Sequence, residues 1–175
     1  MAANQKAKLL ALREILLRES DEEHPLSAGR MAELLARQGI EAERKSVYAD
    51  IEALREAGMD IVRSGEGRGS GYFVASRRFE LAELKLLVDS VQSSKFITAR
   101  KTRALIGKLE GLTSRYEARS LSRQVYVTGR VKTMNESIYY NVDELHRAIA
   151  ADRQIRFHYF EYTAQRKRQY RREGQ

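Results

Sequence analysis

Four glycines at alternate positions, in the run SGEGRGSGY over residues 64–72, constrain the fold of this chain more than any other feature. Glycine readily adopts the backbone conformations of tight turns, and the run separates two β-like segments, DIVR and GYFVA. It matches neither common phosphate-binding loop, because no Gly-Lys-Ser/Thr closes it, its spacing is not G-x-G-x-x-G, and a strand follows it. We therefore predict a β-hairpin with a glycine-rich tip, carrying Arg63 and Arg68. A hairpin turn without a ligand is the alternative interpretation.

Three helices are predicted before this hairpin. Leucines at helical spacing indicate an amphipathic helix over residues 5–20. A second helix has Ser27 as its N-cap and Gly39 just past its end, and a third helix begins at Arg44 and ends at Gly58. The order helix, helix, helix and hairpin is that of a winged helix-turn-helix domain.

The third helix concentrates positive charge in its first turn. Val47, Ile51 and Leu54 recur at i, i+4 and i+7 and are expected to face the core. The first turn of a recognition helix is the part that enters the major groove of DNA, whereas basic residues there oppose the helix dipole. A solvated charged face is the alternative interpretation. The candidate DNA-binding residues are Arg44, Lys45, Ser46, Tyr48 and Arg55 on the helix, with Arg63 and Arg68 on the hairpin.

The spacing of apolar residues changes along the chain after the hairpin. Apolar residues at helical spacing predict a helical connector over residues 79–122, whereas residues 123–140 lack a clear period and are expected to form a linker with one short strand at VYVTG. A helix capped by Asn141 follows, and alternating residues over 153–163 predict a strand that is covered on both faces. The basic run RKRQYRR is expected to return antiparallel to that strand.

The net charge of +8 suggests a polyanionic partner. The first 78 residues contain 13 Lys/Arg and 13 Asp/Glu, so the whole excess of positive charge lies after them. If the first part binds DNA, the local placement of charge must be responsible.

Several classes of function are disfavoured. The chain has no cysteine, which excludes disulfides and thiolate chemistry, and its three histidines lie far apart without acids at metal-binding spacing. No residues combine into a catalytic group, so we expect neither an enzyme, nor a metal site, nor a cofactor. No apolar run approaches the roughly 20 residues of a membrane span, and the N-terminus is unlike a signal peptide. We expect a cytoplasmic protein.

The sequence RKSVYADIEALREAGMDIVRSGEGRGSGYFV resembles the N-terminal winged helix-turn-helix of bacterial WYL-domain transcriptional regulators, which are DeoR-like in this part. The residues that fit are Arg44, Lys45, Ser46, Val47, Tyr48, Asp50, Ile51, Leu54, Gly58, Gly71 and Tyr72. The chain departs from the family pattern at Ala49, often Arg in the family, and at Ser46 in place of Thr. Because one expected basic contact is missing, operator preference cannot be transferred.

The resemblance continues through the connector to residues 138–162, which look like the opening helix and strand of a WYL domain, a small Sm-like β-barrel. The chain has no Trp and so lacks the Trp-Tyr-Leu signature, which suggests a chain truncated inside that domain. The resemblance implies a homodimer that binds double-stranded DNA. The apolar stripes on the helices of residues 79–122 make this connector the expected dimer contact. It also implies an effector, a small molecule or a nucleic acid, received by the missing part of the barrel.

We therefore predict a mainly α protein with small β elements. The expected parts are a winged helix-turn-helix at residues 1–78, a connector at 79–122, a linker at 123–140 and the beginning of a WYL domain at 141–175. The alternative function is an RNA or single-stranded nucleic-acid module that uses the basic and aromatic C-terminal half.

Overall fold

The computed structural model describes residues 2–65, 70–124, 132, 137–158, 160–165 and 167–170. In this part of the chain it contains seven helices and two small antiparallel sheets, so the expectation of a mainly helical protein with little β structure is confirmed. The chain divides into two compact units, Met1–Lys132 and Thr133–Gln175, which are described separately below.

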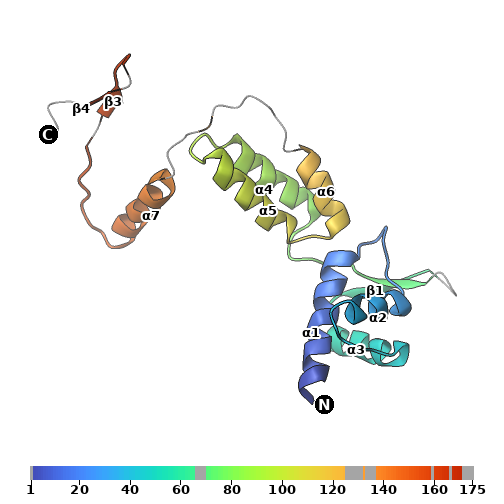
Figure 1. Ribbon diagram of the computed structural model, residues 1–175. Coiled ribbons are helices and arrows are strands. Elements are labelled where there is room, and N and C mark those ends of the chain that lie inside the picture. The colour runs from blue at the N-terminus through green and yellow to red at the C-terminus, as the bar shows by residue number, and fades with distance from the viewer. Residues whose placement is uncertain are drawn as a thin grey trace. The chain divides into compact units, whose positions relative to one another are not determined.

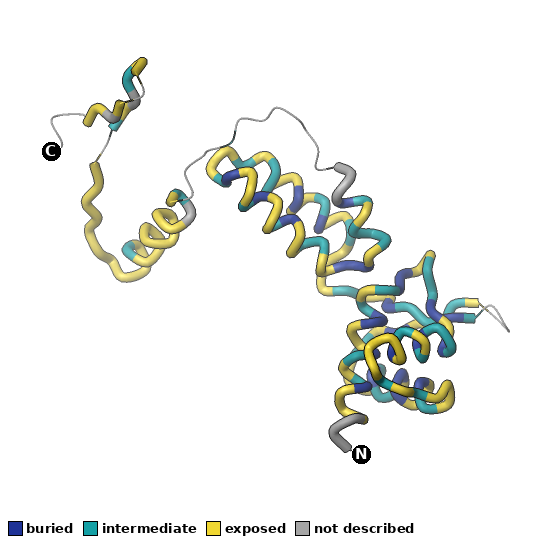
Figure 2. The backbone as a smooth tube through the Cα atoms, viewed as in Figure 1, coloured by how far each residue is buried: buried dark blue, intermediate teal, exposed yellow. Residues whose placement is uncertain are grey.

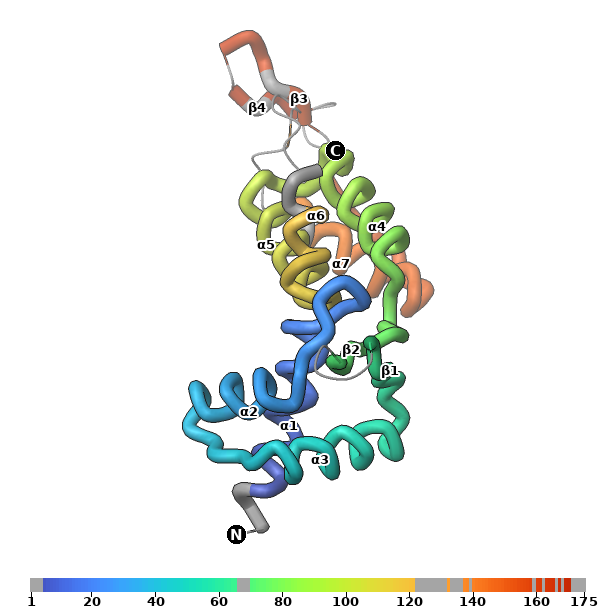
Figure 3. The backbone as a smooth tube through the Cα atoms, turned by 90° about the vertical axis from the view of Figure 1, so that its right-hand side faces the viewer, coloured from blue at the N-terminus to red at the C-terminus, as the bar shows by residue number. Residues whose placement is uncertain are grey.

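Three helices and a hairpin open the first unit, in the predicted order (Figure 1). The elements are α1 (Ala2–Glu19), α2 (Ala28–Ala36), α3 (Arg44–Glu56), β1 (Ile61–Ser64) and β2 (Gly71–Val74). Helices α2 and α3 lie beside α1 in both views of the chain, and all three pairs of these helices are in contact (Figure 3).

The predicted ends of α2 and α3 are confirmed. The hydroxyl of Ser27 accepts a hydrogen bond of 3.2 Å from the backbone N–H of Arg30, in the first turn of α2. Gly39 and Gly58 have φ angles of +76° and +93°, in the left-handed region that favours glycine. Next to Gly58, the backbone N–H of Met59 donates to the carbonyl of Leu54, which satisfies a terminal carbonyl of α3.

The core of the first unit lies between α1, α2, α3 and the hairpin. Its fully buried members come from each helix, as the dark blue inner faces in Figure 2 show: Leu12, Leu16, Met31, Leu35, Val47 and Ile51. Burying a side chain of this size stabilises the fold by roughly 1.5–3 kcal/mol. The apolar faces predicted for α1 and α3 are therefore the faces that pack.

The hairpin is attached to the helices by a close backbone contact. Strands β1 and β2 pair antiparallel, with Ile61 opposite Val74. Leu26 and Tyr72 exchange two backbone hydrogen bonds of 2.8 Å, which adds the segment before α2 to the edge of β2. A Cβ atom at Gly71 would lie 2.8 Å from Cβ of Pro25, so glycine at this position makes the pairing sterically feasible.

The connector forms a second small core. It consists of α4 (Leu81–Ser93), α5 (Ala99–Glu110) and α6 (Arg115–Gln124), with buried Leu84, Val88, Ile106 and Leu121. Thr98 caps α5 as its side chain accepts from the backbone N–H of Lys101 at 3.2 Å. The ammonium of Lys132 donates to the carbonyls of Val91 and Ser94 at the end of α4, where positive charge is favourable to the helix dipole.

A buried polar cluster joins α6 to the end of α1. The hydroxyl of Ser114 donates a 2.5 Å hydrogen bond to Asp21, whose carboxylate also lies 2.7 Å from Nδ1 of His24. The ring of His24 stacks on Tyr116 at a centroid distance of 3.6 Å. Burial alone would raise the pKa of Asp21, but the hydrogen bonds from Ser114 and His24 offset it and hold that pKa below its usual value of 3.8.

The second unit contains α7 (Ser137–Ala150), β3 (Phe160–Tyr162) and β4 (Arg168–Tyr170). The predicted antiparallel return is confirmed, with Phe160 opposite Tyr170. Two details of the prediction are wrong. Asn141 lies inside α7 rather than at its N-cap, and the expected strand over 153–163 is shorter and open to solvent, since Phe157 is 72% exposed. The strand expected at 125–129 lies outside the described residues.

Replacing Gly71 should test the contact that attaches the hairpin. Gly71→Ala should lower the free energy of unfolding by about 1–3 kcal/mol, because the added methyl group overlaps Pro25 and forces backbone shifts. Gly107→Ala is the matched control: apart from the adjacent backbone of its own helix, no atom lies within 4 Å of its new Cβ, and alanine favours the helix by roughly 1 kcal/mol. Urea unfolding followed by circular dichroism measures both, and equal effects would contradict the proposed overlap.

Acid should weaken the cluster around Asp21. Because its folded-state pKa is lowered, the carboxylate stabilises the fold above the unfolded pKa, and this contribution is lost as the pH falls through the folded-state pKa. The loss of stability in Asp21→Asn should therefore be fully present at about pH 7 and should diminish as the pH falls below 3.8, the usual pKa of an aspartate. Ser114→Ala should behave similarly, whereas Ser93→Ala, on the exposed side of α4, should not. A difference from wild type that does not change with pH would refute this role.

Candidate nucleic-acid interface

The first turn of α3 presents two cationic side chains to solvent. Arg44 and Lys45 are both exposed, and no acidic residue lies in this turn. Helix α3 follows directly on Glu43, which makes no side-chain capping hydrogen bond, so the backbone N–H groups at this end are open to an anion. The guanidinium of Arg44 lies against Gly29, where a Cβ atom would approach its Nε to 3.2 Å. Gly29 of α2 thus leaves room for this side chain.

A buried ion pair lies beneath this turn. The ammonium of Lys8, in α1, lies 2.8 Å from Oδ2 of Asp50, and the two side chains are only 11% and 9% exposed. The contact with Oδ2 is an ion pair rather than an aligned hydrogen bond. Lys8 also donates a hydrogen bond to Oγ of Ser46, so this hydroxyl faces α1. Ser46, one of the predicted DNA-binding residues, is therefore half-buried and hydrogen-bonded to α1.

Lys8 is a buried residue that the leucine spacing of α1 does not identify. The sequence feature that indicates a buried cation is an acidic residue in α3. Asp50 is one residue before the buried Ile51 and three residues after the buried Val47, so it shares their face of the helix. A carboxylate on a buried face requires a cation or a hydrogen-bond donor. Its partner comes from a helix that is distant in sequence.

Tyr48 and Arg55 connect α3 to the hairpin. The ring of Tyr48 is 47% exposed and meets Tyr72 of β2 edge to face, with 6.2 Å between centroids. Nε of Arg55 donates a 2.8 Å hydrogen bond to the carbonyl of Ile61, and its guanidinium lies 5.6 Å from the centroid of the Tyr72 ring. Arg55 therefore braces α3 against both strands, while Tyr48 remains accessible.

The hairpin contributes Arg63 to the same surface. Arg63 lies opposite Tyr72 in the register of the two strands, so the two side chains project from one face of the hairpin. Its guanidinium donates a hydrogen bond of 3.2 Å to Oγ of Ser70. Arg68 lies within residues 66–69, outside the described part of the chain.

The structure thus brings together Arg44, Lys45 and Tyr48 on one exposed face of α3, since these residues are three and four positions apart. Through Tyr72 this face continues to Arg63. The surface combines cations with an aromatic ring and a free helix N-terminus, which suits a phosphate backbone and the base edges beside it.

The described residues give no indication of a metal site or of a membrane-spanning helix. They contain no group of three or more His, Asp or Glu side chains placed to hold a metal ion. None of their helices is both long and apolar enough to cross a membrane.

Removing Lys8 should leave Asp50 as an uncompensated buried charge. Lys8→Met should lower the free energy of unfolding by about 3–5 kcal/mol, and the double variant Lys8→Met with Asp50→Leu should recover much of this loss. Lys6→Met, the same substitution at an exposed position of α1, is the control and should have little effect. Urea unfolding measures all of these variants. Independent, additive effects at the two positions would refute the pairing.

No protein-family model matches the chain. No curated protein and no solved structure matches it either.

Proposed function

We propose that this chain is a sequence-specific DNA-binding transcriptional regulator, with α1, α2, α3 and the hairpin acting as a winged helix-turn-helix. The observation that carries the proposal is the exposed cationic first turn of α3, where Arg44 and Lys45 have no acidic neighbour in the turn. The resemblance of residues 44–75 to WYL-domain regulators also supports DNA binding.

In this proposal α3 enters the major groove with its first turn leading. Arg44 and Lys45 contact guanine edges or phosphates, and the exposed ring of Tyr48 contacts a phosphate or a thymine methyl group. Arg63 and Arg68 of the hairpin contact the backbone or the minor groove. Ser46 and Arg55 then act mainly by positioning α3, because one is bonded to Lys8 and the other to the carbonyl of Ile61.

We further propose that the regulator is a homodimer formed through the connector. Helix α4 and the segment after it expose Leu86 and Phe96 by 69% and 73%, although these side chains are large and apolar. A second connector packed against them would remove this surface from water. An effector, received through a WYL domain that begins in Thr133–Gln175, would complete the proposed regulator.

The DNA-binding proposal can be tested with duplexes selected from a random pool. Wild-type affinity should fall by about 10³-fold between about 50 and 200 mM salt if six phosphates are contacted per dimer. Arg44→Ala with Lys45→Ala should weaken binding and make the salt dependence shallower, because two cations per chain no longer displace counterions.

The matched control is Arg103→Ala with Lys108→Ala, which removes the same charge from exposed positions of α5. An inverted repeat in the selected duplexes would indicate two-fold symmetry of the bound protein. Affinity that does not depend on salt, or equal affinities of the two double variants, would exclude the proposed interface. Loss of all binding on deletion of residues 163–175 would instead favour the single-stranded nucleic-acid alternative.

A further inference from the structure

A cleft of about 1060 Å³ lies within the first unit, between α1, the base of the hairpin and the helices α5 and α6. Its volume lies just above the roughly 300–1,000 Å³ typical of small-molecule sites. It includes Gly58, Met59 and Asp60, which directly follow the end of α3. Since α3 has 13 residues and rises about 1.5 Å per residue, the cleft lies about 20 Å from the first turn. It is therefore separate from the proposed DNA-binding face.

Arginine dominates the lining of the cleft. Three acidic residues, Glu14, Asp60 and Glu110, also line it, but they are outnumbered two to one. The arginines are Arg13, Arg18, Arg77, Arg78, Arg115 and Arg119. The site therefore has an excess of positive charge in a concave surface, which raises the local concentration of anions.

Part of this charge is already engaged by the fold. Arg77 donates hydrogen bonds of 2.7 and 2.6 Å to the carbonyls of Leu17 and Ser20, at the end of α1. Arg13 and Arg115 form ion pairs, with Glu14 and Glu19 respectively. These three arginines shape the cleft rather than remain open to a ligand.

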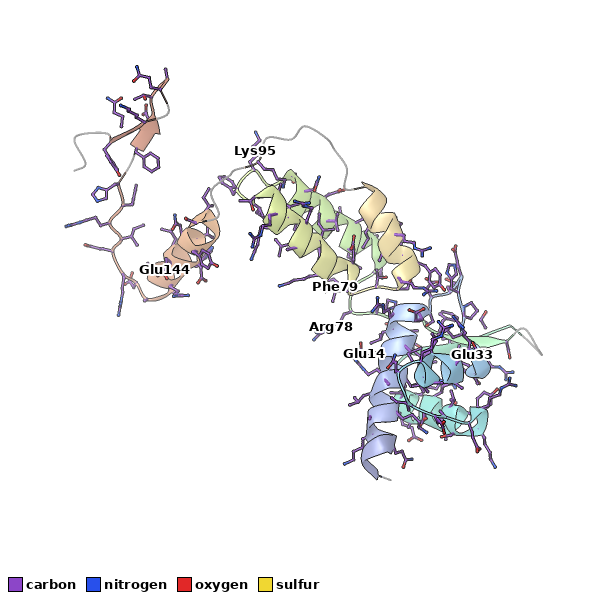
Figure 4. The ribbon with its side chains drawn as sticks, in the orientation of Figure 1. Glu14, Glu33, Arg78, Phe79, Lys95 and Glu144 are labelled. Atoms are coloured by element: carbon purple, nitrogen blue, oxygen red, sulfur yellow. The ribbon has the colours of Figure 1, made fainter. Side chains whose placement is uncertain are left out.

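The other three arginines remain open. Arg18, Arg78 and Arg119 are exposed, and none has an ion pair or hydrogen bond to the side chains of the described residues. They come from α1, from the segment between β2 and α4, and from α6, so three elements direct guanidinium groups to one site. Figure 4 shows Arg78 on that segment and Glu14 on α1, extending to the same side of the chain.

We propose that this cleft binds a small anion that carries two or more phosphate groups. Guanidinium groups bind phosphate oxygens in a bidentate manner, and several of them from different elements match a chain of phosphates better than a single one. Met59 and the 40% exposed Leu112 also line the cleft and offer apolar contact to an organic part of the ligand. The proposal goes beyond DNA binding and does not depend on it.

Tripolyphosphate is a suitable probe because it carries the phosphate chain alone. Titration of the full chain by calorimetry at low ionic strength should show saturable binding, which sulfate at equal ionic strength should not reproduce. Arg18→Ala with Arg119→Ala should weaken binding by about tenfold or more, since a hydrogen bond to a charged group contributes at least this factor. Arg103→Ala with Arg153→Ala removes the same charge from exposed positions outside the cleft and should change affinity little.

Gly107 offers a second variant that preserves the fold. It lies in α5 and lines the cleft, and apart from the adjacent backbone of α5 no atom lies within 4 Å of a Cβ atom added there. Both Glu and Gln favour a helix over Gly, so neither Gly107→Glu nor Gly107→Gln should destabilise α5. Gly107→Glu introduces a negative charge and should weaken tripolyphosphate binding by about tenfold relative to Gly107→Gln, which has the same size without the charge.

Three results would overturn the proposal. The first is the absence of saturable binding of tripolyphosphate. The second is binding that is unaffected by both the arginine and the Gly107 variants, which would place the anion elsewhere on the chain. The third is weaker binding of duplex DNA by Arg18→Ala with Arg119→Ala in the absence of tripolyphosphate, which would make the cleft a contact for the DNA backbone. Loss of DNA binding in Arg44→Ala with Lys45→Ala alone leaves the cleft proposal unaffected.

Discussion

The ion pair between Lys8 and Asp50 is the constraint on which the geometry of the first unit depends. Both side chains are about nine-tenths buried, and a buried charge without its partner costs several kcal/mol. Hydrophobic contacts are not directional, so the apolar core alone specifies the orientation of α3 against α1 less sharply than a polar contact does. An ion pair of 2.8 Å between the two helices limits rotation and sliding of α3 against α1. The ion pair thereby fixes the direction in which the exposed face of α3 points.

This constraint also explains why the first turn of α3 can hold exposed arginine and lysine. Their positive charge opposes the helix dipole at this end, an effect of about 0.3–1 kcal/mol. The carboxylate of Asp50 lies less than two helical turns away, and packing of Val47 and Ile51 in the core stabilises the helix. The tertiary structure therefore outweighs the local electrostatic cost. The same packing positions Tyr48 against Tyr72, which connects the helix to the hairpin.

Features that depend on local sequence were predictable, and features that depend on distant partners were not. The cap at Ser27, the left-handed glycines at 39 and 58 and the hairpin follow from residue types at short spacing. The contact between Asp21 and Ser114 joins residues 93 positions apart, so no local pattern predicts it. Asparagine favours the N-cap position, which predicts a helix start at Asn141, but α7 extends one further turn towards the N-terminus. Propensity alone cannot decide between these two helix starts.

The candidate site shows the same division. Exposure of Arg44 and Lys45 follows from the apolar spacing of α3, whereas the engagement of Ser46 by Lys8 and of Arg55 by Ile61 required the tertiary structure. The cleft was even less predictable from the sequence, since its arginines come from three separate segments.

The two ends of α3 have different surroundings, and one rigid helix connects them. Its first turn carries the exposed cations, and the residues after its last turn form part of the arginine-lined cleft. A ligand in the cleft would contact α1 and α6 together, and the buried cluster of Asp21, His24 and Ser114 already fixes these helices to each other. In the proposed regulator, a ligand that bound one orientation of α3 relative to α1 and α6 more tightly than another would change DNA affinity. By thermodynamic linkage, DNA would then change the affinity of the cleft by the same factor.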